Sequence, residues 1–368
     1  FNLPATMTIK SFFQLLLLPL SWLYGVGVFV RNKQFDLGLR KQVAFEIPLI
    51  VVGNLSVGGT GKTPMTAYLL NRLLPVKKSG VLSRGYRRKS TGYMEVTEFT
   101  AVSETGDEPK LIKQKFPHAV VAVSESRALG IATMIHENQE LELVILDDAF
   151  QHRQIVAGLS LLLTEYDNPF SGDRLLPAGR LREPISGSKR ANGIIVTKCP
   201  ITLTLEKRNQ LAIELTTFHP QPVFFSYLKY AEPYHISDSA KKYLIKAGDE
   251  VLLFCGIANP KPLVSFLEQQ SVIVHLFRFR DHHNYSTQDL NSIRSGYEKL
   301  KGKRSVMLTT EKDAVRLHAH KELIINEQLE IYCIPVEIVF FEEDGALFDE
   351  FIAAYVNSSV YIPQHALS

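Results

Sequence analysis

The glycine-rich stretch from Ser56 to Thr63, Ser-Val-Gly-Gly-Thr-Gly-Lys-Thr, constrains the fold more than any other part of the chain. It follows the apolar run at 49–52 and precedes a helix-like stretch that starts at Pro64. Strand, glycine-rich turn and helix form the context of a phosphate-binding loop. In such a loop, consecutive backbone N–H groups turn toward one anion at a helix N-terminus. The sequence therefore predicts a nucleotide site in an α/β fold.

The loop has residues for both phosphate and metal. Lys62 is expected to reach the β- and γ-phosphates of a nucleotide, and the Thr63 hydroxyl to ligate Mg²⁺. Ser56 stands where the strict pattern has a glycine, and Gly58 and Gly59 supply flexibility instead. A chance glycine turn is the alternative, which the intact Gly-Lys-Thr between strand and helix disfavours. The predicted loop consists of Ser56, Val57, Gly58, Gly59, Thr60, Gly61, Lys62 and Thr63.

Length and composition indicate a globular protein of two domains or one large one. The chain has 368 residues, of which 45% are hydrophobic and 21% charged. A net charge of +3 is too small to argue for a nucleic-acid partner. The three cysteines, Cys199, Cys255 and Cys333, are far apart and lie in or beside apolar runs, which favours buried thiols in a reducing compartment.

Short runs rich in Val, Ile and Leu follow one another through the first part of the chain. Such runs are typical of strands buried on both faces. Helix-like stretches between several of them indicate a mainly parallel sheet with helices on both sides. Polar residues and glycines follow the runs, at the sheet edge where ligands bind. The runs are at 49–52, 80–82, 120–123, 143–146, 159–163 and 194–196.

A second, smaller α/β unit is expected after Pro220. Residues 223–230 alternate in character and are interpreted as a connecting strand, and residues 345–356 as a closing helix. Further strand candidates are at 251–254, 272–277, 306–309 and 331–334. We therefore expect an N-terminal helical segment over 7–40, a nucleotide-binding domain over 41–220 and a smaller α/β domain with a β-linker over 221–368.

The N-terminal run at 12–30 contains no charged side chain and has basic residues on both sides. A cleaved signal peptide is disfavoured because a nucleotide loop follows soon after. A membrane-spanning helix fits the length, although one proline and two glycines interrupt the run. A buried core helix is a third interpretation. A helix pair in the cytoplasmic face of a membrane agrees best with the basic flanks and Trp22.

Two acidic positions are candidates for the chemistry. Asp147 and Asp148 end an aliphatic strand, where nucleotide-hydrolysing folds hold Mg²⁺; an ordinary strand-end turn is the alternative. Asp107 starts a helix and is either a helix cap or the base that positions the acceptor of a phosphoryl group. A histidine from the second unit, His282 or His283, would orient such a base near neutral pH.

Arginines gather at the predicted strand ends. Arginine binds phosphate in a bidentate manner, and a solvated basic face is the alternative. Beside an N-terminus that seeks a membrane, such a cluster suggests an acceptor that is anionic and lipidic. The cluster consists of Arg84, Arg87, Arg88, Arg127, Arg180 and Arg182.

Taken together, the motifs resemble the tetraacyldisaccharide 4′-kinase family, the kinases of lipid A synthesis on the inner membrane of Gram-negative bacteria. Each motif alone is weak, whereas the ordered set is specific. The motifs are Gly-Gly-Thr-Gly-Lys-Thr-Pro at 58–64, Ser-Arg-Gly-Tyr at 83–86, Thr-Gly-Asp-Glu-Pro at 105–109, Leu-Asp-Asp-Ala-Phe-Gln-His-Arg at 146–153, Leu-Pro-Ala-Gly-Arg-Leu-Arg-Glu at 176–183, Asp-His-His at 281–283 and Thr-Glu-Lys-Asp-Ala-Val at 310–315.

The resemblance implies two P-loop-like α/β domains joined by a β-linker, with a cleft between them. It implies transfer of the γ-phosphate of ATP to the 4′-hydroxyl of a tetraacylated glucosamine disaccharide 1-phosphate, giving lipid IVA, with ATP and Mg²⁺ as cofactors. Asp107 corresponds to the family's catalytic base and His282 to its partner from the other domain. The metal positions correspond to Thr63, Asp147 and Asp148. Positions that line the cleft correspond to Tyr86, Arg127, His152, Arg182 and Glu183.

The resemblance also implies a peripheral or monotopic protein on the cytoplasmic face of the inner membrane, with a membrane lipid as substrate and no obligate protein partner. The residues alone leave two other functions open. One is a soluble phosphate-loop kinase or ligase that acts on a small metabolite. The other is a regulatory NTPase, either a switch or a metallochaperone, although the sequence has no evident cluster of metal ligands.

Overall fold

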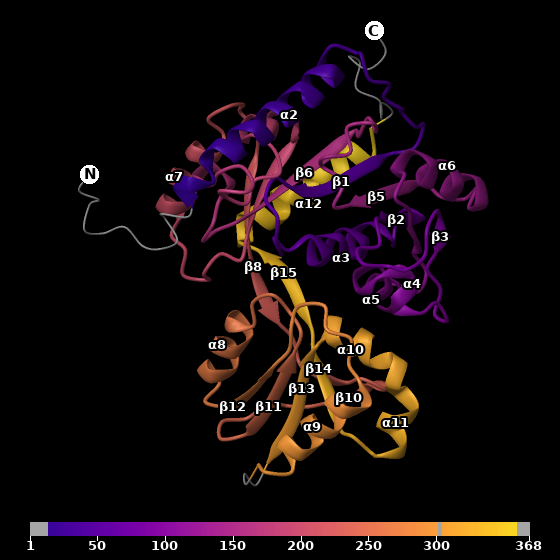
Figure 1. Ribbon diagram of the computed structural model, residues 1–368, viewed down its shortest axis with the longest axis vertical. Helices are drawn as coiled ribbons and strands as arrows, with labels where there is room; N and C mark the ends of the chain where they lie inside the picture. Colours follow the sequence, from indigo (N-terminus) through magenta and orange to yellow (C-terminus); the bar gives the residue numbers. More distant parts are fainter. Residues whose placement is uncertain (1–13, 301–303, 359–368) are drawn as a thin grey trace.

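The computed structural model describes residues 14–300 and 304–358, which form two mostly parallel sheets (Figure 1). The first sheet has nine strands in the order β15-β8-β7-β6-β1-β5-β2-β4-β3, and the second has six in the order β10-β9-β14-β13-β11-β12. The α/β architecture expected from the short apolar runs is therefore confirmed. Each of those runs lies within a strand.

The first sheet is parallel except at its two edges, where β3 pairs antiparallel with β4 and β15 with β8. The phosphate-loop strand β1 lies inside the sheet, between β5 and β6. The strands are β1 (Leu49–Asn54), β2 (Ser79–Ser83), β3 (Met94–Glu95), β4 (Val120–Val123), β5 (Leu143–Asp147), β6 (Leu159–Glu165), β7 (Gly193–Thr197), β8 (Val223–Tyr230) and β15 (Val336–Phe340).

Both faces of the first sheet are covered, which explains why its central strands are mostly apolar. In β1, Ile50 and Val52 belong to one core cluster, and Leu49 and Val51 to the other, because alternate side chains point to opposite faces. One face is covered by α3 (Lys62–Leu73), α5 (Asp107–Lys115) and α12 (Glu342–Val356), and the other by α6 (Arg127–Glu137) and α7 (Leu205–Leu215). The four-residue helix α4 (Val102–Thr105) precedes α5, and 3₁₀ turns lie at Phe170–Gly172 and Ile185–Arg190.

The second sheet has a parallel centre and an antiparallel hairpin at one edge. The parallel strands are β11 (Glu250–Cys255), β12 (Ile273–Arg278), β13 (Ser305–Thr310) and β14 (Ile331–Ile334), and the edge strands are β9 (Tyr234–His235) and β10 (Asp238–Lys242). Helix α8 (Lys261–Gln269) covers one face. The other is covered by α9 (Thr287–Tyr297), α10 (Glu311–Leu317) and α11 (Lys321–Asn326), with a 3₁₀ turn at His318–His320.

The chain returns to the first sheet after completing the second. Figure 1 shows β8 and β15 side by side, running between the two parts of the molecule. Phe348 of α12 is fully buried on the first sheet, where its ring stacks on Phe340 with centroids 4.5 Å apart. The residues from β15 to the end of α12 therefore pack with the first sheet, although the expected division placed 221–368 in a second domain. The chain returns to the first sheet because aromatic side chains of β15 and α12 pack in the core of that sheet.

The N-terminal helix α2 (Leu18–Asp36) runs without interruption through Gly25 and Gly27. Of its side chains, Ser21 and Phe35 are buried, so α2 differs from the buried core helix that was one interpretation of this run. No helix within the described residues has the length and apolar character needed to cross a membrane. Residues 7–13 of the expected segment lie outside the described residues. The exposed apolar side chains include Leu20, Trp22, Leu23, Val26, Phe29 and Val30.

Candidate active site

The phosphate-binding loop joins β1, which ends at Asn54, to α3, which begins at Lys62. Gly58 and Gly61 have positive φ angles of 119° and 86°, a backbone conformation that glycine adopts without a steric cost. A Cβ atom at Gly58 or Gly59 would meet no heavy atom within 4 Å. The loop is therefore an open cradle of backbone at a helix N-terminus, which fits a nucleotide phosphate.

Neighbouring strands fix the loop from the side. The Thr197 hydroxyl, at the end of β7, donates a hydrogen bond to the carbonyl of Thr60 at 2.9 Å. Lys198 Nζ donates to the carbonyl of Gly59 at 2.5 Å and forms an ion pair with Glu165. These contacts hold the loop in shape before any anion binds.

Lys62 lies between the phosphate-binding loop and the carboxylate of Asp148. Its Nζ donates to Asn54 Oδ1 and to the carbonyl of Gly58, both at 3.4 Å, and lies 3.7 Å from Asp148 Oδ1. Arg182 binds the same carboxylate through two nitrogens, at 2.9 and 3.4 Å. Burial raises the pKa of Asp148, but the charges of Lys62 and Arg182 outweigh it and lower that pKa to about 2.

Asp147, the other member of the acidic pair, is held differently. Its side chain is buried, and the Thr66 hydroxyl donates to Oδ1 at 3.4 Å. Burial, together with the nearby Glu108 and Asp148, raises the pKa of Asp147 to about 7. The two neighbouring aspartates therefore have opposite pKa shifts, because the charges of Lys62 and Arg127 offset only part of the effect of burial on Asp147.

This acidic pair suits a magnesium ion that arrives with a nucleotide. Mg²⁺ binds through one or two carboxylates together with phosphate oxygens and waters. Asp147, Asp148 and the buried Thr63 are the oxygen donors at the end of β5 and the start of α3. Among the described residues, no group of three or more His, Cys, Asp or Glu side chains is arranged to hold a metal ion by itself. The donor set therefore fits a cation that shares its ligands with phosphates.

Asp107 from the first sheet meets His282 from the second. Gly106, with φ of 89°, turns the chain between α4 and α5, so that Asp107 begins α5. His282 Nδ1 lies 3.0 Å from Asp107 Oδ2, and the N–H of Glu108 donates to Oδ1 at 3.0 Å. Asp107 is thus the first residue of α5, whose N-cap is Gly106, and it pairs with a histidine. Its side chain is 6% exposed.

The adjacent His283 has a different environment. Its Nε2 contacts Asp289 Oδ2 at 3.0 Å, and its ring stacks on Phe279 with centroids 4.6 Å apart. The sequence left the choice between the two histidines open until the family resemblance favoured the first. In the structure, His282 is the one that contacts Asp107.

Arg316, which sequence reasoning did not single out, binds the same carboxylate. It donates to Asp107 Oδ2 through Nε at 3.1 Å and also through one Nη. Burial raises the pKa of Asp107, but the hydrogen bond with His282 and the charges of Arg316 and Lys312 more than offset it. That pKa therefore lies well below its usual range. Arg316 directly follows the Thr-Glu-Lys-Asp-Ala-Val motif, three residues after Asp313, and this spacing was the available signal.

Ion pairs join helix α5 of the first sheet to helix α10 of the second. Besides the Asp107–Arg316 pair, Glu108 binds Lys312, and Lys115 binds Glu311 at 2.8 Å. The charges of both Lys312 and Lys62 act on the carboxylate of Glu108. The start of α5 therefore lies within electrostatic range of the phosphate-binding loop as well as of the second sheet.

Among the predicted cleft residues, Tyr86 lies at the junction of the two sheets, with its ring 5.4 Å from that of His282. Arg182 contacts α2, because the Tyr24 hydroxyl donates to its carbonyl at 2.7 Å. Glu183 is buried and forms an ion pair with Arg190 at 2.8 Å.

The other two predicted cleft residues are Arg127 and His152. Arg127 is 2% exposed and donates to the carbonyls of Ser124 at 2.5 Å and Asp147 at 3.3 Å. Burial lowers the pKa of Arg127 to about 10. For His152, burial together with Arg127 and Arg84 lowers the pKa to about 4, so its imidazole is neutral at neutral pH. Through its hydrogen bond to the carbonyl of Asp147, Arg127 holds the end of β5 in place.

Comparisons with known proteins show the family of the chain. The family model described as LpxK, tetraacyldisaccharide-1-P 4′-kinase, matches residues 13–357. The chain belongs to this kinase family. Curated tetraacyldisaccharide 4′-kinases from Phocaeicola vulgatus and Bacteroides thetaiotaomicron are both 40% identical to it, over 93% of this chain and 95% and 93% of theirs. The crystal structure of LpxK from Aquifex aeolicus in complex with ATP has a TM-score of 0.71 at 29% identity, over 93% of this chain and 99% of that one.

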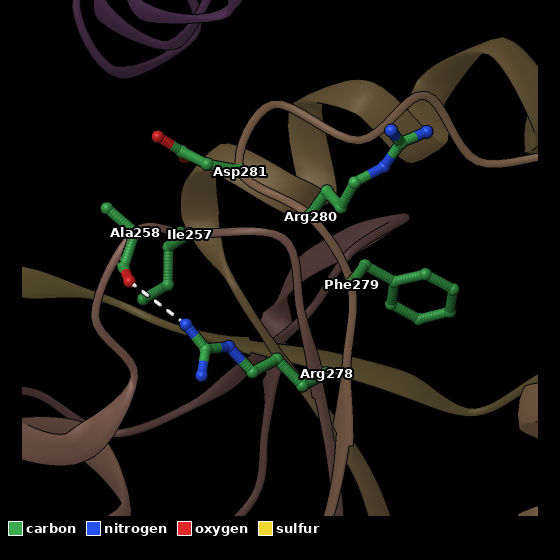
Figure 2. A pocket seen from close by; sticks show the side chains of 6 residues that line it. All are labelled: Ile257, Ala258, Arg278, Phe279, Arg280 and Asp281. Atoms are coloured by element: carbon green, nitrogen blue, oxygen red, sulfur yellow. Dashed lines mark hydrogen bonds between the residues drawn. The ribbon is translucent and has the colours of Figure 1, made fainter.

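In this member of the LpxK family, two neighbouring cavities open beside the loop at 279–286 between β12 and α9, called the histidine loop because it carries His282 and His283. One, of about 340 Å³, is shown in Figure 2, where Arg278 reaches across to the carbonyl of Ala258 at 3.4 Å. The other, of about 520 Å³, combines Arg87 from the first sheet with the loop of the second. Its lining residues are Arg87, Arg280, Asp281, His282, His283 and Asn284. The space around His282 is therefore open and rich in positive charge.

Proposed function

We propose that this protein transfers the γ-phosphate of ATP to the 4′-hydroxyl of a tetraacyldisaccharide 1-phosphate, a step of lipid A biosynthesis that gives lipid IVA. The observation that carries the proposal is the contact between Asp107 and His282 beside a phosphate-binding loop. A phosphoryl transferase needs a group that positions the acceptor, and a simple nucleotide switch does not. The name shared by the relatives identifies the acceptor class.

The nucleotide phosphates would lie in the cradle from Ser56 to Thr63, with Lys62 on the β- and γ-oxygens. Lys62 is already aimed at the loop, since its Nζ contacts the carbonyl of Gly58. Binding of the nucleotide would release Lys62 from Asn54 and bring its ammonium group onto phosphate oxygens. That contact joins two opposite charges and is stronger than the one it replaces.

Thr63, Asp147 and Asp148 would hold Mg²⁺, which neutralises charge on the β- and γ-phosphates during transfer. Asp148 is ionised at neutral pH, because its pKa is about 2. Asp147, with a pKa of about 7, is partly protonated at neutral pH, and an approaching cation would favour its ionised form.

Asp107 would accept the hydrogen bond and then the proton of the 4′-hydroxyl, while His282 orients it. Transition states of phosphoryl transfer need little deprotonation of the nucleophile at the start. The carboxylate of Asp107, whose pKa is low, therefore suffices as long as it orients the 4′-hydroxyl toward the γ-phosphate. We further propose that the acceptor is contacted by Tyr86, His152, Arg182 and Glu183. Arg127 would hold the metal site in place through its hydrogen bond to the carbonyl of Asp147.

The two sheets with their helices would act as separate domains that close around the substrates, divided near residue 220 as expected, with β8, β15 and α12 staying on the first sheet. We propose that β8 and β15, which connect the sheets, permit this motion. The N-terminal segment, 7–40, would lie at the cytoplasmic face of the inner membrane. The exposed apolar side chains of α2 support this placement, and the Tyr24–Arg182 contact would keep the membrane-facing helix beside the reaction centre.

The direct test is an acceptor assay. The purified protein, γ-labelled ATP, Mg²⁺ and a tetraacylated disaccharide 1-phosphate are incubated in detergent, and label is sought in the lipid. We expect labelled lipid from the parent and from Lys78→Ala, an exposed lysine, and none from Lys62→Ala. A protein that binds ATP but labels no lipid would contradict the proposal and favour a small-metabolite kinase or a regulatory NTPase.

A further inference from the structure

Arg316 lies where the two sheets meet and binds residues from both. Its Nη1 donates to the carbonyl of Gly256 and to Asp313 Oδ1, each at 2.8 Å, while Nε and Nη2 donate to Asp107. Nη2 also lies 3.4 Å from His282 Nδ1. The guanidinium is 3% exposed. One planar cation therefore touches both members of the Asp107–His282 pair.

The contacts of Arg316 also hold the loop that carries the histidine. The backbone N–H of His282 donates at 3.1 Å to the same Gly256 carbonyl that Arg316 binds. Asp313, bound to Arg316, accepts hydrogen bonds from the N–H of Gly256 at 3.1 Å and the hydroxyl of Tyr285 at 3.0 Å. The end of β11, the histidine loop and α10 are thus tied to one side chain.

We propose that Arg316 is a positioning residue for phosphoryl transfer, which aims the Asp107 carboxylate and the His282 imidazole at the acceptor hydroxyl. This inference rests on the proposed kinase reaction. The guanidinium fork matters because it reaches Gly256, Asp313 and Asp107 at once. A lysine ammonium on a flexible stem cannot match that planar geometry.

A charge effect accompanies the positioning. Asp107 faces His282, Arg316 and Lys312 from the second sheet and has Glu108 as its acidic neighbour. Arg316 belongs to the groups that hold the pKa of Asp107 below its usual range, so its removal raises that pKa. The carboxylate of the variant is then less strongly stabilised in its ionised form, and it also lacks the guanidinium fork that fixes its direction.

The experiment compares Arg316→Met with Lys115→Met, which breaks another α5–α10 ion pair without touching Asp107. For Arg316→Met we expect kcat to fall about tenfold or more while the KM and Kd for ATP stay within about twofold. Lys115→Met should keep the parent kcat. If Arg316→Met binds ATP like the parent and keeps the parent kcat, the proposal is wrong.

Arg316→Lys keeps the charge and provides the decisive variant if Arg316→Met melts far below the parent. We expect its kcat to fall severalfold while the KM for ATP stays within about twofold, because the fork is lost. A parent-like kcat in Arg316→Lys would overturn the positioning role. A parent protein that phosphorylates no lipid would instead refute the proposed function, so the two failures are distinguishable.

Discussion

At the scale of single residues, the two aspartates after β5 differ although they are neighbours in the chain. Asp148 has two cationic partners and is ionised over the physiological pH range. Asp147 is buried beside two other carboxylates, which raises its pKa to about 7. A positive φ of 48° at Asp148 turns the chain here, so the two side chains reach different surroundings. The local sequence Asp-Asp predicts an acidic site but not this division.

The pKa of Asp147 predicts a pH-dependent affinity for Mg·ATP. Mg²⁺ binds the ionised carboxylate, so a proton must leave Asp147 when Mg·ATP binds below neutral pH. The affinity for Mg·ATP should therefore fall as the pH decreases from about 8 to about 6, by up to about tenfold per pH unit below the pKa. Calorimetric titration at several pH values measures this. Asp147→Asn should bind more weakly and show only the titration of the nucleotide itself. Equal pH dependence in parent and variant would contradict the prediction.

How far the sequence predicts the site depends on whether a residue belongs to a local pattern. The loop around Lys62 was predictable because strand, glycines and helix follow one another. The residues alone suggested that His282 or His283 partners Asp107, and the family resemblance favoured His282, although 175 positions separate it from Asp107. Thr197, Lys198 and Arg316 have no motif of their own, and their contacts depend on how distant segments fold together.

At the scale of elements, the apolar runs predicted the central strands because burial on both faces leaves a clear signal. The short edge strands β3, β9 and β10 were not predicted, and β10 is exposed along its whole length. Helix α12 was predicted as a closing helix, but not its place on the first sheet. That place follows from the fit of Phe348 against Phe340 and Phe224.

The packing of α12 predicts a large loss of stability when Phe348 is truncated. Phe348→Ala removes a fully buried ring and should lower the free energy of unfolding by about 3–5 kcal/mol. Leu347→Ala, on the exposed side of the same helix, should change it by less than about 0.5 kcal/mol. Urea unfolding of both variants measures the difference. Similar losses in the two variants would show that α12 does not pack as described.

The apolar surface of α2 predicts binding to lipid. Trp22 and Leu23 are 71% and 61% exposed, and each apolar Å² removed from water contributes about 25 cal/mol. Replacing both with Glu should weaken binding to anionic vesicles about tenfold or more. Ile213→Glu, at a 74% exposed position on α7, is the matched control and should bind like the parent. Vesicle sedimentation in which all three proteins bind equally would exclude α2 as the lipid-binding element.

At the scale of the whole molecule, the candidate site is complete only where the two sheets meet. The first contributes the phosphate-binding loop, the acidic pair and Asp107, and the second contributes His282 and Arg316. Two strands, β8 and β15, connect the sheets, and three ion pairs join α5 to α10. When the two sheets approach each other, Asp107 and His282 therefore come together as the pair that receives the acceptor hydroxyl. Strand runs and motifs predicted the parts, whereas their meeting depends on long-range packing.

A double-mutant cycle across the two sheets tests this account most directly. The kcat for lipid phosphorylation is measured for Asp107→Asn, His282→Gln and the double variant, with His283→Gln as the control. Because the pair acts as one unit, we expect each single change to lower kcat about a hundredfold or more, and the double variant to be no slower than the slower single variant. His283→Gln should stay close to the parent. If the two losses multiply in the double variant, Asp107 and His282 act independently, and the account of a site assembled from both sheets is wrong.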